Sequence, residues 1–226
     1  MKLPMLKCFL IFALAVFTCI FSPQLTFAAT IHKTNTTLSK FNAKESFSLH
    51  SSALRALMLD FYECQPQALQ KSTKVSKEEF VQWVFEGPFS WRFDAIKNVQ
   101  SIEALALSFS QAYQGDRVLP LITGLYTMLL QAYGGKNEYT FKVPNPQNLS
   151  IATRNIDIVT AKLLMENQEN NYFDVNETCR IKVRQALNEL AKQVNIDASK
   201  IDSSTQTSKL INPLEKDANT IEFIPF

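Results

Sequence analysis

Glycine and histidine are scarce in this sequence. Only 5 of its 226 residues are glycine and only 2 are histidine. So little glycine argues against glycine-rich phosphate-binding loops and against β-architectures that need many tight turns. Two histidines supply few ligands for a histidine-based metal site, and we expect neither a metal nor another cofactor. With 46% apolar and 19% charged residues, the chain has the composition of neither a disordered protein nor a coiled coil.

An excess of either charge is also missing. Lys and Arg total 23 and Asp and Glu total 21, and the small surplus lies at the N-terminus. There, residues 1–28 have the pattern of a secretory signal: Lys2 and Lys7, an apolar run over 8–21, and a small residue at Ala28. Removal of this segment leaves 21 charges of each sign. We therefore expect an exported protein, periplasmic or secreted, that does not bind nucleic acid.

Two features leave an association with a membrane open. Lipidation of Cys19 would make the protein a membrane-anchored lipoprotein, although Phe17 and Thr18 stand where lipid-attachment sites have small residues. The second feature is the run Val118–Gly135, which has no charged residue. Its threonines, tyrosines and glutamine make it polar for a membrane span, so we interpret it as a central helix that is buried on all sides.

Cysteine is scarce as well. Of the four cysteines, Cys8 and Cys19 belong to the signal segment, which leaves Cys64 and Cys179. Each of these two continues a stripe of apolar residues at helical spacing, so we expect both to face the core. Two such cysteines in an exported protein predict one disulfide between them. The alternative is two separate buried thiols.

The remaining pattern predicts a mainly α-helical single domain of about six helices, with at most a short two-stranded element. Apolar spacing and capping residues place the helices at about 51–64, 77–86, 101–114, 117–133, 148–165 and 177–194. The expected starting residues of the later helices are Ser76, Ser101, Asp116, Asn148 and Asn176. Residues 138–143 alternate and predict a short strand. The resulting organisation is a signal over 1–28, a flexible lead-in over 29–45, the helical domain over 46–195, and a polar, partly extended tail over 196–226.

Six aromatic residues lie between positions 80 and 93, close to several carboxylates. Aromatic rings stack on sugars, and a neighbouring carboxyl group can protonate a glycosidic oxygen. Trp83, Trp91, Glu86 and Asp94 are therefore candidate binding residues of a carbohydrate-acting, peptidoglycan-type hydrolase. The competing interpretation, which we favour, is that the rings anchor a loop to the helical core.

Two arginines form a second candidate site. Arg117 and Arg154 are suited to clamp a carboxylate or a phosphate between them. The alternative is structural: Asp116 caps a helix, and Arg154 pairs with Asp157 on one helix face. We favour this structural alternative.

Three short segments carry a resemblance to known proteins. Asp116-Arg117, Gly124–Met128 and Ala152–Ile156 resemble the corresponding parts of a group of exported bacterial proteins with no assigned activity. The resemblance spans residues 100–165. It implies export and an α-rich domain, and it assigns no catalytic residue.

The sequence thus favours an exported envelope protein that binds another envelope protein or a small apolar ligand. Catalysis by a nucleophile needs a neighbouring base, and the only imidazoles, His32 and His50, lie in or beside the expected lead-in. We assign no catalytic residue and favour a protein that is not an enzyme. The hydrolase and the membrane-anchored lipoprotein are the alternatives.

Overall fold

Helices dominate the part of the chain that the computed structural model describes, which is residues 41–165, 173, 175–209 and 222. The predicted signal with Cys19, residues 29–40 of the predicted lead-in and about half of the predicted tail lie outside these residues. The described part contains seven α-helices and one antiparallel pair of short strands, which confirms the mainly α fold. The helices are α1 (Ala43–Cys64), α2 (Pro66–Ser72), α3 (Lys77–Glu86), α4 (Ser101–Ser108), α5 (Val118–Ala132), α6 (Pro146–Leu164) and α7 (Glu177–Lys209), and the strands are β1 (Gly135–Asn137) and β2 (Thr140–Phe141).

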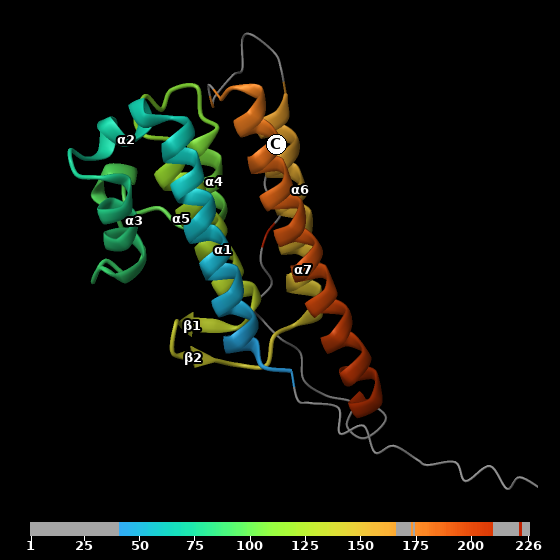
Figure 1. The fold of residues 1–226 in the computed structure, drawn as a ribbon. Coiled ribbons are helices and arrows are strands. Elements are labelled where there is room, and N and C mark those ends of the chain that lie inside the picture. Colours follow the sequence, from blue (N-terminus) through green and yellow to red (C-terminus); the bar gives the residue numbers. More distant parts are fainter. Residues whose placement is uncertain (1–40, 166–172, 174, 210–221, 223–226) are drawn as a thin grey trace, which may run out of the picture. The chain divides into compact units, whose positions relative to one another are not determined.

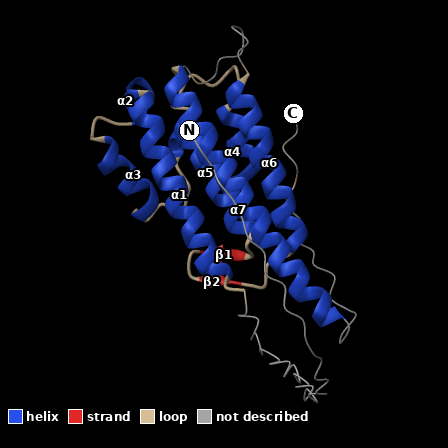
Figure 2. Cartoon of the chain, turned by 45° about the vertical axis from the view of Figure 1, so that its right-hand side comes forward, coloured by secondary structure: helices blue, strands red, loops and turns tan. Residues whose placement is uncertain are grey.

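Four long helices, α1, α5, α6 and α7, lie side by side and form the body of the domain (Figure 1). Helix α4 packs against α5, and α3 packs against α1. The hairpin of β1 and β2 lies near the N-terminal end of α1 (Figure 2). It turns at Asn137, whose side-chain oxygen accepts hydrogen bonds from the backbone N–H groups of Tyr139 and Thr140. The core therefore lies where the long helices meet.

Helix α5 is buried on every side, as the absence of charge predicts. Its core side chains are fully shielded from solvent, and these are Leu121, Ile122, Leu125, Met128 and Leu129. The expected neighbours, α4 and α6, do pack against it, and α1 is a third. Close approach of α4 depends on Gly124, because a Cβ atom there would lie 2.6 Å from Cγ of Leu105. Within the described residues, no helix combines the length and the apolarity that a membrane crossing requires.

Several helix starts follow the predicted capping chemistry. The Ser76 side chain accepts the N–H of Glu79, and α3 has the predicted bounds. Asp116 accepts the N–H of Val118 at the start of α5, and Asn176 accepts the N–H of Cys179 at the start of α7. Each of these side chains satisfies a backbone donor that the first helical turn leaves unpaired.

Two predicted caps are wrong. Ser101 is the first residue of α4, has a φ of 50°, and gives its own N–H to the hydroxyl of Thr127. The start of α6 is capped by Asn145, whose side chain accepts the N–H of Gln147, whereas Asn148 lies inside the helix and is buried. At α6 an asparagine three residues upstream takes the capping role, whereas α4 begins without a side-chain cap.

Three helix bounds differ from the prediction, and one helix was missed. Helix α4 ends at Ser108 and not at residue 114. Helix α1 begins at Ala43, eight residues before the predicted start, so residues 43–45 of the predicted lead-in are helical. Helix α7 continues to Lys209, which makes residues 196–209 of the predicted tail helical. Helix α2, which starts at Pro66, was not predicted. In both extensions the described side chains include exposed polar residues such as Lys44, Ser199 and Lys200. These polar residues interrupt the apolar pattern of the face that packs on the core.

A disulfide joins Cys64, the last residue of α1, to Cys179 in the first turn of α7, with 6.0 Å between the Cα atoms. The predicted pairing is confirmed. Both cysteines are half-buried, so they lie at the edge of the core and not within it. The bridge spans 115 residues of sequence and fixes the C-terminal end of α1 to the N-terminal end of α7.

Replacement of Leu125 by alanine tests the central position of α5. We expect the variant to lose roughly 2–5 kcal/mol of unfolding free energy, because the change removes buried apolar surface and leaves a cavity. Leu49→Ala is the matched control, since Leu49 lies on α1 with 68% of its surface exposed. Urea denaturation measures both. Equal, small losses in the two variants would contradict the central burial of α5.

Candidate functional site

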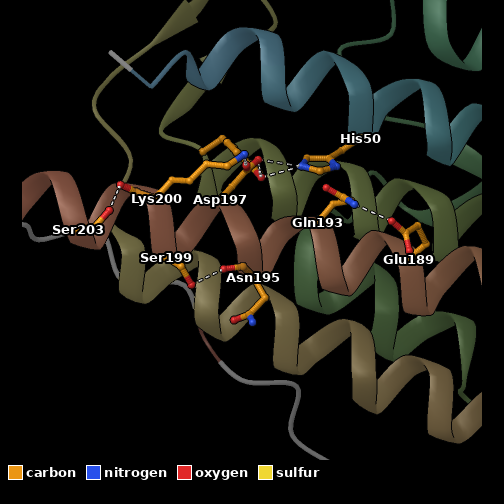
Figure 3. Close-up of polar contacts among 9 residues, drawn as sticks. His50, Glu189, Gln193, Asn195, Asp197, Ser199, Lys200 and Ser203 are labelled. Atoms are coloured by element: carbon orange, nitrogen blue, oxygen red, sulfur yellow. Dashed lines mark hydrogen bonds and ion pairs between the residues drawn. The ribbon is translucent and has the colours of Figure 1, made fainter. Parts of the chain in front are cut away.

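A histidine, a tyrosine and an aspartate meet in the interior, and each comes from a different part of the bundle. His50 lies on α1, Tyr133 directly follows α5, and Asp197 lies on α7. The Tyr133 hydroxyl is 2.7 Å from Nε2 of His50 and 2.9 Å from Oδ2 of Asp197. His50 and Asp197 also face each other directly, with 3.5 Å between Nε2 and Oδ2. All three residues are buried, and Figure 3 shows His50 and Asp197 approaching each other across the gap between α1 and α7.

The geometry indicates which atom donates the hydrogen in each hydrogen bond of this cluster. A carboxylate only accepts hydrogen bonds, so the Tyr133 hydroxyl donates its proton to Asp197. The tyrosine oxygen then accepts from Nε2 of His50, which places a hydrogen on that nitrogen. Every polar atom at the meeting point thus has a partner, which a buried polar cluster requires.

The environment shifts the two acidic groups in opposite directions. Burial raises the pKa of Asp197, but hydrogen bonds from His50, Lys200 and Tyr133 outweigh it and bring this pKa down to about 2. Lys200, three residues along α7, approaches Oδ1 at 3.0 Å from the solvent side. Burial and the negative charge of Asp197 raise the pKa of Tyr133 well above its ordinary value. The cluster therefore holds a carboxylate and a neutral phenol at neutral pH.

A polar groove of about 470 Å³ lies on the other side of α7, against the start of α6. Its walls carry amide, hydroxyl and carboxylate side chains, together with one proline and one alanine. The lining residues are Asn145, Pro146, Gln147, Ser150, Asn195, Ala198, Ser199 and Asp202. In Figure 3, Asn195 and Ser199 point toward α6, whereas Asp197 points toward His50. One segment of α7 thus contributes to both the buried cluster and the open groove.

The aromatic candidates divide between the core and the surface. Trp91 is buried and stacks on Tyr126, with 3.6 Å between ring centroids, and its indole N–H donates to Glu138. A φ of 59° turns Trp91 inward from the loop that follows α3. Trp83 lies on α3 with 46% of its surface exposed, and Phe89 is also exposed. For Trp91 the structure agrees with the anchoring interpretation.

The carboxylates near these rings have structural partners. Glu86 pairs with Arg55 and accepts a hydrogen bond from Gln82, and these contacts lower its pKa. Asp94 is exposed and accepts a hydrogen bond from the side chain of Asn98. A general acid of a glycosidase needs a raised pKa, so the shift at Glu86 has the wrong direction for that role.

The two candidate arginines lie in different settings. Arg117 donates to the backbone carbonyls of Ser108, Ser110 and Tyr113, which places it at the end of α4. Arg154 is exposed on α6. The neighbouring Asp116 is buried and accepts hydrogen bonds from Tyr62, Ser72 and the N–H of Val118. The predicted cap by Asp116 is confirmed, whereas the pairing of Arg154 with Asp157 stays a prediction. Arg117 binds backbone carbonyls at the end of α4.

The buried cluster was missed because its members are far apart in sequence. His50 and Tyr133 are 83 residues apart, and Tyr133 and Asp197 are 64 apart. One signal was available: His50 lies three residues after Phe47 and four before Leu54, on the same face of a helix. A helix that begins before residue 50 turns this histidine toward the core.

Removal of the Tyr133 hydroxyl tests the cluster. We expect Tyr133→Phe to lose about 1–3 kcal/mol of unfolding free energy, because Asp197 and His50 each lose a buried partner. Tyr139→Phe is the matched control, since Tyr139 is 80% exposed in the hairpin turn. Chemical denaturation compares the two. A loss no larger at Tyr133 than at Tyr139 would show that the hydroxyl contributes nothing.

The lowered pKa of Asp197 predicts a specific pH dependence. The ionised carboxylate stabilises the folded state fully above the unfolded pKa of about 3.9, and this contribution disappears as pH falls through the folded pKa of about 2. We expect wild type to be more stable than Asp197→Asn at pH 7 and pH 5, with a difference that shrinks by pH 3. Urea denaturation at these three pH values measures it. The other carboxylates cancel in the comparison, and a difference that does not change with pH would contradict the assignment.

Comparisons with family models, with curated proteins and with solved structures found no match to this chain. The resemblance of residues 100–165 to exported bacterial proteins therefore stays a prediction. The buried cluster and the groove are the features from which a function can be inferred.

Proposed function

We propose that this chain is an exported helical protein of the cell envelope that binds a partner and does not catalyse a reaction. The observation that carries the proposal of export is the disulfide between Cys64 and Cys179. Disulfides persist in oxidising compartments and are rare where thiols are kept reduced. The N-terminal pattern of residues 1–28 supports the same compartment from the sequence.

The proposed binding function is supported by the arrangement of the polar side chains in the interior and in the groove. His50, Tyr133 and Asp197 contact one another in the interior and join α1, α5 and α7. Their hydrogen bonds hold the helices in a fixed arrangement, as buried polar networks commonly do. The groove between α6 and α7 offers polar side chains to solvent on this fixed support. Side chains held on a rigid scaffold lose less conformational freedom when they bind a partner, which favours recognition.

The hydrolase and the membrane-associated lipoprotein, which are the two alternatives, lack comparable structural support. The hydrolase requires a carboxyl group with a raised pKa beside the aromatic residues, and Glu86 pairs with Arg55 instead. The lipoprotein depends on Cys19, which lies outside the described residues. A membrane association through Val118–Gly135 would need an exposed apolar helix, whereas α5 is the buried centre of the bundle.

Cell fractionation with thiol counting tests the proposal. We expect the chain, expressed in a Gram-negative host, to appear in the periplasm with a mature N-terminus at Ala29 or Thr30. The unreduced, denatured protein should contain no thiol that iodoacetamide alkylates, and reduction should release two. The control is a chain that starts at Met followed by residue 29, which should stay in the cytoplasm with both thiols free.

Two outcomes would contradict this function. The first is a full-length chain that remains in the cytoplasm with Cys64 and Cys179 reduced. The second is a mature chain that begins at a lipidated Cys19, which would make the protein a lipoprotein.

A further inference from the structure

We propose that the groove between the start of α6 and the C-terminal half of α7 binds a neutral carbohydrate. The inference rests on the proposed function of the chain as a binding protein and names the class of ligand. It also differs from the aromatic site that the sequence had indicated, because the groove is lined by none of the six aromatic residues between positions 80 and 93.

The lining combines hydrogen-bond donors and acceptors at short spacing. The Ser150 hydroxyl donates to the carbonyl of Pro146, and the Ser199 hydroxyl donates to the carbonyl of Asn195. Both serine oxygens therefore face the groove as acceptors. The exposed side-chain amides of Gln147 and Asn195 add two N–H donors and one carbonyl acceptor each, and have no hydrogen-bond partner among the described residues. Asp202 also lines the groove.

Sugar hydroxyls match this lining because each can donate one hydrogen bond and accept others. Adjacent hydroxyls on a sugar ring can bind an amide or a carboxylate with both of its polar atoms. The volume of about 470 Å³ lies within the range of small-molecule binding sites. The described lining residues include no lysine or arginine that could bind an anionic ligand.

An extended peptide fits the groove less well. Peptides that bind in extended form usually pair their backbone with a strand edge and place side chains in apolar pockets. Both walls here are helices, whose backbone groups are already bonded within the helix. Pro146 and Ala198 are the only apolar residues among the described lining residues.

Each of the two walls is held in place by contacts within the protein. On α7, Asp197 lies between Asn195 and Ser199 in sequence and is anchored to Tyr133 and His50. On α6, Asn145 accepts the N–H of Gln147 and fixes the first turn. The polar side chains of the groove therefore project from backbones that do not need to rearrange, which lowers the entropic cost of binding.

Saturation-transfer NMR with three neutral trisaccharides tests the proposal. The probes are maltotriose, cellotriose and triacetylchitotriose, each added to the mature, oxidised protein. We expect a transfer signal from at least one of them. In the double variant Gln147→Ala/Asn195→Ala, the dissociation constant for that sugar should rise at least tenfold, because the amides from both walls are removed.

Asn188→Ala is the matched control, since Asn188 is an exposed asparagine on α7 two turns away from the groove. It should leave sugar binding unchanged, and the thermal unfolding of all variants should match wild type. The proposal is overturned if none of the three sugars gives a signal, if Asn188→Ala weakens binding as much as the double variant, or if the uncharged peptide acetyl-Ala-Gln-Ala-Gln-Ala-amide binds and the sugars do not. A chain that is exported and oxidised but binds no sugar would overturn this inference alone and leave the proposed function standing.

Discussion

The architecture depends on one constraint, which is that α5 carries no charged side chain and has to be shielded from water on all sides. A single neighbouring helix covers only one stripe of such a helix, so several are needed. Helices α1, α4 and α6 supply that cover, and α7 in turn packs on α1 and α6. Gly124 allows α4 to come close on one side. The positions of the other long helices therefore follow from the requirement to bury this one.

Buried tyrosine–carboxylate pairs give the packed helices their register. Tyr62 donates to Asp116 and Tyr133 donates to Asp197, and in each pair the two residues come from different helices or from the residues that flank them. The two aspartates differ in their further partners. Burial raises the pKa of Asp116, whose hydrogen bonds come from neutral donors, whereas Lys200 and His50 assist in lowering the pKa of Asp197. A third pair, Tyr126 with Glu138, ties the hairpin to α5. Apolar contact holds the helices together, and these directional bonds select one arrangement.

Local patterns predicted those elements whose ends are fixed by nearby residues. The span of α3 follows from Ser76 and from the Gly87-Pro88 pair, and the burial of α5 follows from its own composition. The disulfide followed from counting cysteines. The first two turns of α1 and the last four of α7 were missed, because their apolar faces are narrow and their partners lie elsewhere in the chain. For the same reason the cluster of His50, Tyr133 and Asp197 and the groove on α7 could not be found: both exist only once distant segments are packed together.

The disulfide has a consequence for the order in which the protein can form. It joins the first helix to the last, across 115 residues of chain. In the exported chain that we propose, Cys64 enters the oxidising compartment before Cys179, and its thiol stays unpaired until Cys179 arrives. His50 on α1 likewise makes its contact with Asp197 only after α7 has been synthesised and has packed on α1. The domain therefore closes late and as a whole, and the interval before closure is the period in which its apolar central helix is exposed to aggregation.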